Sequence, residues 1–165
     1  MTSFTKDGYF RTGDKGYIDT EGYLVLSGRI KEIFKTSMGK YICPSAIENK
    51  LNESVWFNNI MVVGEYQRYA AALIVPNFEM IELYCKEHNI EYLNNEQIVK
   101  NKLVIKRYQQ EIDVYNKFFG ASEQINNFTL LDHEWTIEAG ELTPSYKIKR
   151  DVIIERYSEQ INSLF

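Results

Sequence analysis

The stretch YFRTGDKGYIDTEGYLVLSGRIKEIFKTSMGKYICPSAIE, residues 9–48, carries most of the information about how this chain folds. Turn-forming Gly, Asp and Thr residues separate two short apolar pieces, 16–19 and 23–26, and this pattern predicts a small hairpin. A further short strand precedes the polar loop 37–40, and Pro44 stands where a helix favours proline, in its first turn. The stretch is therefore expected to contain short strands, tight turns and the start of a helix.

The chain downstream of this stretch predicts both strands and helices. The apolar runs 59–64 and 70–75 are typical of an antiparallel strand pair, which Pro76 is expected to end. Helical periodicity begins near Phe78, and apolar residues spaced by three, four or seven predict a longer helix over residues 96–119.

The C-terminal part completes the predicted fold. Residues 124–131 indicate one more strand, and residues 148–165 have the pattern of an amphipathic helix. Residues 31–165 are thus expected to form an α+β domain, with a short antiparallel or mixed sheet packed with helices. Residues 1–30 contain little apolar bulk and are expected to be the edge of another unit.

Composition excludes several classes of protein. A length of 165 residues with 44% apolar residues suits one domain, or one small domain plus a fragment. The net charge of −4 argues against a general nucleic-acid binder. The sequence has no apolar run near the roughly 20 residues that cross a bilayer, and it begins without the apolar core of a signal peptide. Cys43 and Cys85 lie far apart, which fits a reducing compartment, so the cytoplasm is expected.

Two charged residues of the hairpin region have both a local and a functional interpretation. The carboxylate of Asp14 can cap backbone N–H groups of its own turn, or it can accept hydrogen bonds from the cis-diol of a ribose. Arg29 follows the flexible Gly28, and it can be a solvated side chain or a bidentate contact to phosphate.

Two further loops allow the same pair of interpretations. The loop of Ser37, Met38, Gly39 and Lys40 can be a simple hairpin turn or a loop that approaches a ligand closely. Lys147 follows a Pro-containing turn just before the last helix. Cations at a helix N-terminus are mildly unfavourable, so this lysine is a candidate for stabilising phosphate and carboxylate charge in a transition state. The two histidines have no partners at ligand spacing, and no metal site is predicted.

The order and spacing of these motifs resemble a known family. The stretch of residues 9–48, followed far downstream by GELTPSYKIKR at residues 140–150, is similar to adenylate-forming (AMP-binding) enzymes, and within them to the long-chain fatty acid–CoA ligases, or acyl-CoA synthetases. The resemblance implies that residues 31–165 are the small C-terminal lid domain. It also implies that residues 1–30 are the C-terminal edge of the large adenylation domain, with a β-hairpin remnant that ends at the hinge.

The resemblance implies roles for three of the charged residues. Asp14 matches the aspartate that binds the ribose hydroxyls of ATP and of the acyl-adenylate. Arg29 matches an arginine that also contacts the nucleotide. Lys147 matches the catalytic lysine, which stabilises the charge that builds between the acyl carboxylate and the α-phosphate.

The same resemblance implies a conformational role for the remaining motifs. Lys31 falls at the hinge between the two domains. When the small domain swings, the loop of Ser37, Gly39 and Lys40 is expected to face the site for reaction with CoA. That loop usually contains two glycines, and Met38 replaces the first of them, which puts the CoA contact in question.

The activity implied for the whole protein is the formation of acyl-CoA from a fatty acid, ATP and CoA through acyl-AMP. ATP, CoA and Mg²⁺ are its expected cofactors, and none is expected to bind this chain tightly. The phosphate loop, the acyl pocket and the Mg²⁺-binding glutamate belong to the adenylation domain, the expected partner upstream, so this chain alone is expected to be inactive. The sequence is also compatible with peripheral contact between the protein and a membrane surface.

Two alternative functions remain at this point. The chain can be the C-terminal domain of an adenylate-forming ligase for another carboxylic acid, because acyl specificity lies in the other domain. It can also be a non-catalytic interaction module derived from the lid domain. Asp14, Arg29 and Lys147 argue against the second alternative, since a module without chemistry does not need them.

Overall fold

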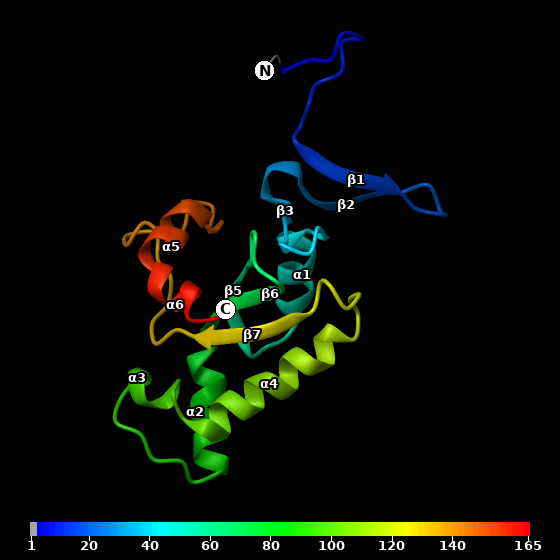
Figure 1. Ribbon diagram of the computed structural model, residues 1–165. Coiled ribbons are helices and arrows are strands. Elements are labelled where there is room, and N and C mark those ends of the chain that lie inside the picture. The colour runs from blue at the N-terminus through cyan, green and yellow to red at the C-terminus, as the bar shows by residue number, and fades with distance from the viewer. Residues whose placement is uncertain (1–2) are drawn as a thin grey trace.

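A three-stranded sheet lies at the centre of the computed structural model, which describes residues 3–165 apart from the side chain of Ser27. The strands β5 (Phe57–Val63) and β6 (Ala70–Pro76) are antiparallel, and β7 (Ile125–Leu130) pairs parallel to β6 on its other side. Figure 1 shows this sheet between the two groups of helices. The predicted strands and the mixed sheet are confirmed, with Pro76 as the last residue of β6.

The central strand β6 sends its side chains alternately into two cores. Ala72 and Ile74 belong to the first core, whereas Leu73 and Val75 belong to the second. Because both faces are covered, the strand contains an unbroken apolar run and not an alternating one. The first core is closed by α1 (Pro44–Leu51), α2 (Phe78–Glu87) and α4 (Lys102–Asn116), and the second by α5 (Arg150–Arg156), α6 (Ser158–Asn162) and the segment 131–142.

The helix predicted over residues 96–119 is two helices, so this prediction is wrong in its extent. A short helix, α3 (Asn95–Ile98), precedes α4, and the chain turns at residues 99–101. The Asn101 side chain accepts hydrogen bonds from the N–H groups of Leu103 at 2.8 Å and Val104 at 3.5 Å. An asparagine that caps a helix N-terminus competes with a continuous helix through the same position.

The amphipathic helix predicted over residues 148–165 is also divided. Tyr157 separates α5 from α6, with φ −104° and ψ 25°. Ile153 and Tyr157 are buried in the second core, while Ile148 lies before the helix and pairs with Leu142 in an isolated β-bridge. The predicted apolar side, made of Ile148, Val152, Tyr157, Ile161 and Phe165, is therefore correct only in part. Tyr157 is buried, but Phe165 is 39% exposed, and the buried Ile153 and Leu164 were not predicted to lie on that side.

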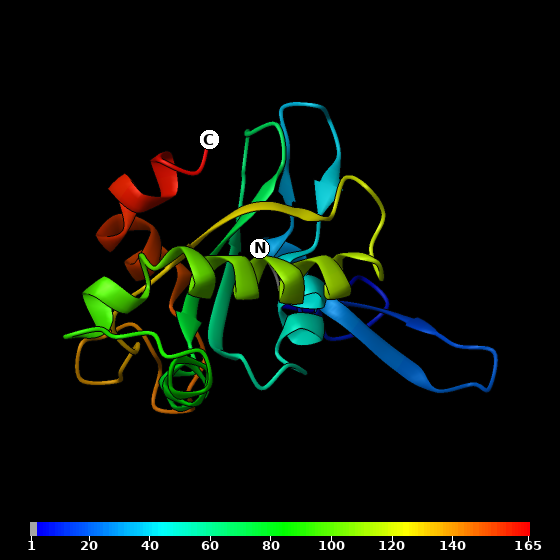
Figure 2. The ribbon, with the colours of Figure 1, turned by 90° about the horizontal axis from the view of Figure 1, so that it is seen from below.

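The N-terminal part forms a separate hairpin, as predicted. The strands β1 (Asp14–Ile18) and β2 (Leu24–Arg29) are antiparallel, and Figures 1 and 2 show the hairpin extending away from the central sheet. A single 3₁₀ turn, η1 (Ile30–Glu32), leads to the short strands β3 (Phe34–Lys35) and β4 (Tyr41–Ile42).

The domain boundary between residues 30 and 31 remains a prediction. The first two residues of the predicted N-terminal unit lie outside the described residues. Among the helices of residues 3–165, none combines the length and the apolar character that a bilayer-crossing segment needs.

Candidate functional site

The hairpin brings Asp14 and Arg29 together. The two residues are cross-strand partners of β1 and β2, and the Arg29 Nε lies 3.2 Å from the Asp14 Oδ1. Both side chains reach solvent, with exposed fractions of 59% for Arg29 and 29% for Asp14. The Asp14 N–H donates to the Thr12 Oγ1 at 3.1 Å. Thr12 therefore closes the local turn, and the Asp14 carboxylate faces an arginine.

The segment that follows the hairpin contains Lys31, which is exposed on η1. Near the end of β2, the backbone of Gly28 passes close to the start of α1 with φ +149°. A Cβ at this position would lie 2.5 Å from the Cys43 Sγ and overlap the Ser45 Oγ. Glycine is thus required there, because it allows both the left-handed backbone angle and the close approach.

The loop of Ser37, Met38, Gly39 and Lys40 is a tight turn between β3 and β4. Thr36 closes it: its N–H donates to the Lys40 carbonyl at 2.8 Å, and its carbonyl accepts from the Gly39 N–H at 2.9 Å. Gly39 has φ +79°, whereas Met38 is not at positive φ and its side chain is 68% exposed. The position that needs glycine still has it, and Met38 does not distort the turn.

Lys147 lies on a second tight turn, between the bridged residues Leu142 and Ile148. Thr143 holds this turn closed, since its N–H donates to the Lys147 carbonyl at 2.8 Å and its Oγ1 accepts from the Lys147 N–H at 3.0 Å. Tyr146 adopts φ +58°, and the Lys147 side chain is exposed. The backbone of this turn is thus fixed while the lysine projects into solvent.

A buried carboxylate, Glu141, supports the base of that turn. It accepts hydrogen bonds from the Tyr157 hydroxyl at 2.7 Å, from Arg156 at 2.8 Å and from the Thr136 N–H at 3.0 Å. Burial alone would raise the pKa of Glu141, but these three donors lower it below its ordinary value of 4.5. The Glu141 carbonyl also accepts from the Lys149 N–H at 2.8 Å, so the network holds both ends of the turn.

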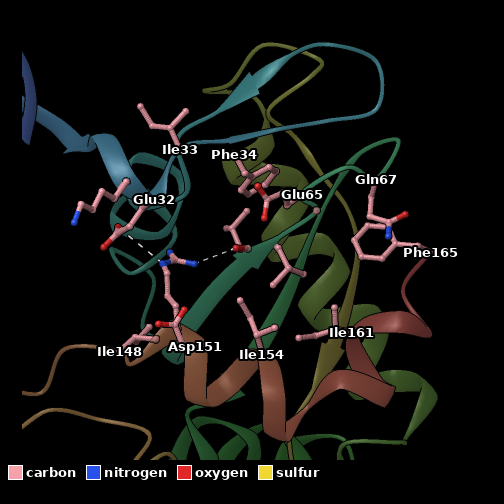
Figure 3. A pocket seen from close by; sticks show the side chains of 15 residues that line it. Glu32, Ile33, Phe34, Glu65, Gln67, Ile148, Asp151, Ile154, Ile161 and Phe165 are labelled. Atoms are coloured by element: carbon pink, nitrogen blue, oxygen red, sulfur yellow. Dashed lines mark hydrogen bonds and ion pairs between the residues drawn. The ribbon is translucent and has the colours of Figure 1, made fainter. Parts of the chain in front are cut away.

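A pocket of about 680 Å³ separates the predicted hinge from the C-terminal helices. Lys31 and Glu32 line one side, and Ile148, Arg150 and Asp151 line the other. Figure 3 shows side chains from both sides directed into this space, including Glu32, Ile148 and Asp151. The pocket is therefore where the chain near Lys31 faces the chain near Lys147.

A buried ion pair beside this pocket was not predicted from the sequence. Arg150 donates to both carboxylate oxygens of Glu48, at 2.5 Å to Oε2. Burial raises the pKa of Glu48, while the Arg150 guanidinium and the Val62 N–H oppose this rise. The sequence contained one indication of this pair. Glu48 falls on the buried side of α1 together with Ile47 and Leu51, where a charged residue needs a partner.

The structure groups the predicted residues only in part. Asp14 and Arg29 form one pair, and Lys31 follows in η1. The loop at Ser37 contacts the β5–β6 connection, where the Ser37 N–H donates to the Gln67 carbonyl at 2.9 Å. Lys147 lies on a different loop, and within residues 3–165 no hydrogen bond or ion pair joins it to these residues. Within the same residues, no three His, Cys, Asp or Glu side chains form a group that could hold a metal ion.

Comparison with known proteins identifies relatives over nearly the whole chain. FadD15 of Mycobacterium tuberculosis, a long-chain-fatty-acid–CoA ligase, is 30% identical over 161 residues, which cover 96% of this chain and 27% of that protein. ACSBG2 of Rattus norvegicus, also a long-chain-fatty-acid–CoA ligase, is 27% identical over 178 residues, which cover 97% of this chain and 27% of that protein. The chain thus spans 27% of the length of these relatives.

Solved structures show the same fold. The adenylation domain of a carboxylate reductase from Mycobacterium chelonae matches with a TM-score of 0.75 at 24% identity, over 98% of this chain and 24% of that one. A fatty acyl CoA synthetase from Mycobacterium tuberculosis matches with a TM-score of 0.52 at 23% identity, over 96% of this chain and 26% of that one. These likenesses confirm the α+β fold. The family model described as the AMP-binding enzyme C-terminal domain matches residues 31–165, and the chain therefore belongs to that family.

Proposed function

We propose that this chain is the C-terminal part of a long-chain fatty acid–CoA ligase. The whole protein would activate a fatty acid with ATP to acyl-AMP and would then transfer the acyl group to CoA. Membership of the family of AMP-binding enzyme C-terminal domains supports the adenylate chemistry. The long-chain-fatty-acid–CoA ligases among the relatives support the choice of acid.

The observation that carries this proposal is the presentation of Lys147. Its turn is closed by two hydrogen bonds between Thr143 and Lys147, and the Lys147 side chain is exposed. A point charge on a fixed backbone can stabilise negative charge that develops between a carboxylate and a phosphate, without a large reorganisation at the moment of reaction. Lys147 is therefore proposed as the catalytic residue of adenylation.

The Asp14–Arg29 pair is proposed to bind the nucleotide. The ion pair involves the Asp14 Oδ1, and the carboxylate remains 29% exposed, so it can still accept hydrogen bonds from ribose hydroxyls. The Arg29 guanidinium is 59% exposed and has further N–H donors for a phosphate. Holding the two charges on adjacent strands fixes their geometry for one ligand.

Two half-reactions at one site need two arrangements of the small domain. We propose Lys31 as the hinge, with residues 1–30 belonging to the large domain and residues 31–165 to the lid. After adenylation, the turn of Ser37, Gly39 and Lys40 would face the site for reaction with CoA. The closed turn, with Gly39 at positive φ, supports this role, whereas the exposed Met38 side chain stands where a second glycine would allow closer approach.

The hairpin surface supports the presence of a partner domain. Large apolar side chains of this region remain more than half exposed, among them Tyr17, Ile18, Tyr23 and Leu24. Contiguous exposed apolar side chains are typical of a surface that another unit covers. The adenylation domain would cover this surface and would supply the phosphate loop, the acyl pocket and the Mg²⁺ ligands. The whole protein is proposed to act in the cytoplasm.

Substitution of Lys147 tests the proposal in the full-length protein that contains this chain. Lys147→Ala should lower the rate of pyrophosphate release from ATP and palmitate by roughly 10²-fold or more, and should largely spare acyl-CoA formation from supplied palmitoyl-AMP and CoA. Lys149→Ala, a neighbouring exposed lysine, is the matched control and should leave both rates near wild type.

Two results would contradict the proposal. Equal loss in both half-reactions with Lys147→Ala would exclude a role confined to adenylation. Formation of acyl-CoA by this chain alone, mixed with ATP, palmitate and CoA, would show that no other domain is needed.

A further inference from the structure

Arg150 connects three parts of the small domain through one guanidinium group. It pairs with Glu48 of α1 through Nη2, and its Nη1 donates to the Val62 carbonyl of β5 at 3.2 Å. The Val62 N–H donates in turn to the Glu48 Oε1 at 2.7 Å. Because β5 is an edge strand, Glu48 and Arg150 satisfy backbone groups that no neighbouring strand reaches. Arg150 is therefore firmly attached to the body of the domain.

The same side chain also reaches across the pocket to the segment that follows the hairpin. The Arg150 Nε lies 3.9 Å from the Glu32 Oε2, and the dashed line that starts at Glu32 in Figure 3 marks this ion pair. Glu32 is the last residue of η1 and directly follows Lys31. The pair thus joins the far end of the proposed hinge to α5, beside the pocket that both residues line.

The third connection of Arg150 is through the backbone. Lys147 precedes it by three residues, and Ile148, between them, lines the same pocket. The turn that presents Lys147 thus ends where Arg150 is held. A change in the position of Arg150 relative to the hinge must move the base of this turn.

We propose that Arg150 is a positioning residue that couples the hinge to the Lys147 turn, an inference that rests on the proposed function. Glu32 lies on the lid side of Lys31, so its pair with Arg150 keeps that end of the hinge attached to the body that carries Lys147. Rotation is then confined to the residues before Glu32. The angle of the hinge consequently determines where the Lys147 ammonium group is placed.

The contact with Glu32 can be tested separately from folding. The Glu32 side chain is 34% exposed, so its pair contributes little to stability. In the full-length protein, Glu32→Gln should lower kcat for pyrophosphate release from ATP and palmitate roughly tenfold, because small displacements of a catalytic group are costly. KM for ATP should stay within about twofold, and the thermal midpoint should not move.

Asp151→Asn is the matched control, since Asp151 lines the same pocket one residue after Arg150. It should leave kcat near wild type. Arg150→Lys should lower kcat at least as much as Glu32→Gln, because a lysine cannot contact Glu48, Val62 and Glu32 together. Arg150→Lys is also expected to lower the thermal midpoint. Its effect on kcat can therefore include a loss of stability, and the decisive variant is Glu32→Gln.

A double substitution distinguishes positioning from general damage. If Arg150 and Glu32 act through Lys147, adding Glu32→Gln to Lys147→Ala should cause no further loss. A full additional tenfold loss in that background would overturn the inference, as would equal rates for Glu32→Gln and Asp151→Asn. If Lys147→Ala itself leaves adenylation unchanged, the proposed function fails, and that result is recognisable without the Glu32 variants.

Discussion

Two buried carboxylates show how single residues hold this domain together. Glu48 and Glu141 are both buried, and each is paired with an arginine from the C-terminal region. A buried charge without partners would be very costly, so each carboxylate accepts several hydrogen bonds. Each of them fixes one side of the segment that contains Lys147.

Substitution of Glu141 should change both the stability and its dependence on pH. Its folded-state pKa lies below the ordinary 4.5, so the ionised form is favoured by folding. The resulting stability is fully present above pH 4.5 and is lost as the pH falls through the lower, folded-state pKa. Glu141→Gln should therefore cost about 2 kcal/mol at pH 7 and flatten the acid limb of the stability curve.

Urea unfolding of the chain between pH 3 and pH 7 measures this effect. Glu138→Gln, an exposed glutamate in the same segment, is the control and should leave both the stability and the acid limb unchanged. An acid limb as steep in Glu141→Gln as in the wild type would show that other carboxylates cause the loss.

Single residues differ in how well the sequence reveals them. Asp14, Arg29 and Lys147 could be singled out because motif order and spacing mark them, and the structure adds that the first two are cross-strand partners. Arg150 could not be assigned from the sequence. Its partners Glu48 and Glu32 are about a hundred residues away, and only the tertiary fold brings them together.

At the scale of elements, the local sequence pattern was sufficient to predict a strand or helix where no side chain competes for the backbone hydrogen bonds. The strands β5 and β6 followed from unbroken apolar runs. The helices were less well predicted, because Asn101 caps α4 inside the expected helix and Tyr157 interrupts the last one. Apolar periodicity gives only an approximate buried side, since it missed Ile153 and Leu164 in the last segment. It also does not report where the helical hydrogen bonds are interrupted.

The attachment of the β1–β2 hairpin to α1 depends on one glycine. Gly28→Ala would place a methyl group against Ser45 and Cys43 at a backbone angle that alanine avoids. We expect a loss of about 2 kcal/mol or more in stability and faster amide exchange over Leu24–Arg29, with little change in the central sheet.

Gly22→Ala is the control for this experiment. Gly22 also has positive φ, at +90°, but a Cβ there would meet no atom within 4 Å. Gly22→Ala therefore introduces the backbone strain of an alanine at positive φ, but no steric contact with other atoms. Equal effects of the two substitutions would mean that the approach to α1 does not matter.

For the whole molecule, the central sheet makes the two cores depend on each other. Ile74 packs on one face of β6 and Leu73 on the other, so loss of either core would expose a face of the same strand. Backbone pairing of β6 with both β5 and β7 transmits that loss across the sheet. We therefore expect the two cores to unfold in a single cooperative transition.

The two tryptophans of the chain allow a direct measurement, because Trp56 lies in the first core and Trp135 in the second. Trp135→Phe leaves a reporter for the first core, and Trp56→Phe leaves one for the second. Adding Leu73→Ala or Ile74→Ala should cost about 2–5 kcal/mol in either background, and the fluorescence midpoint in urea should fall in both reporters. The cooperative interpretation would be wrong if Leu73→Ala lowered the midpoint reported by Trp135 while leaving that of Trp56 unchanged. The second core would then unfold alone, and the segment that presents Lys147 would separate from a sheet that stays folded.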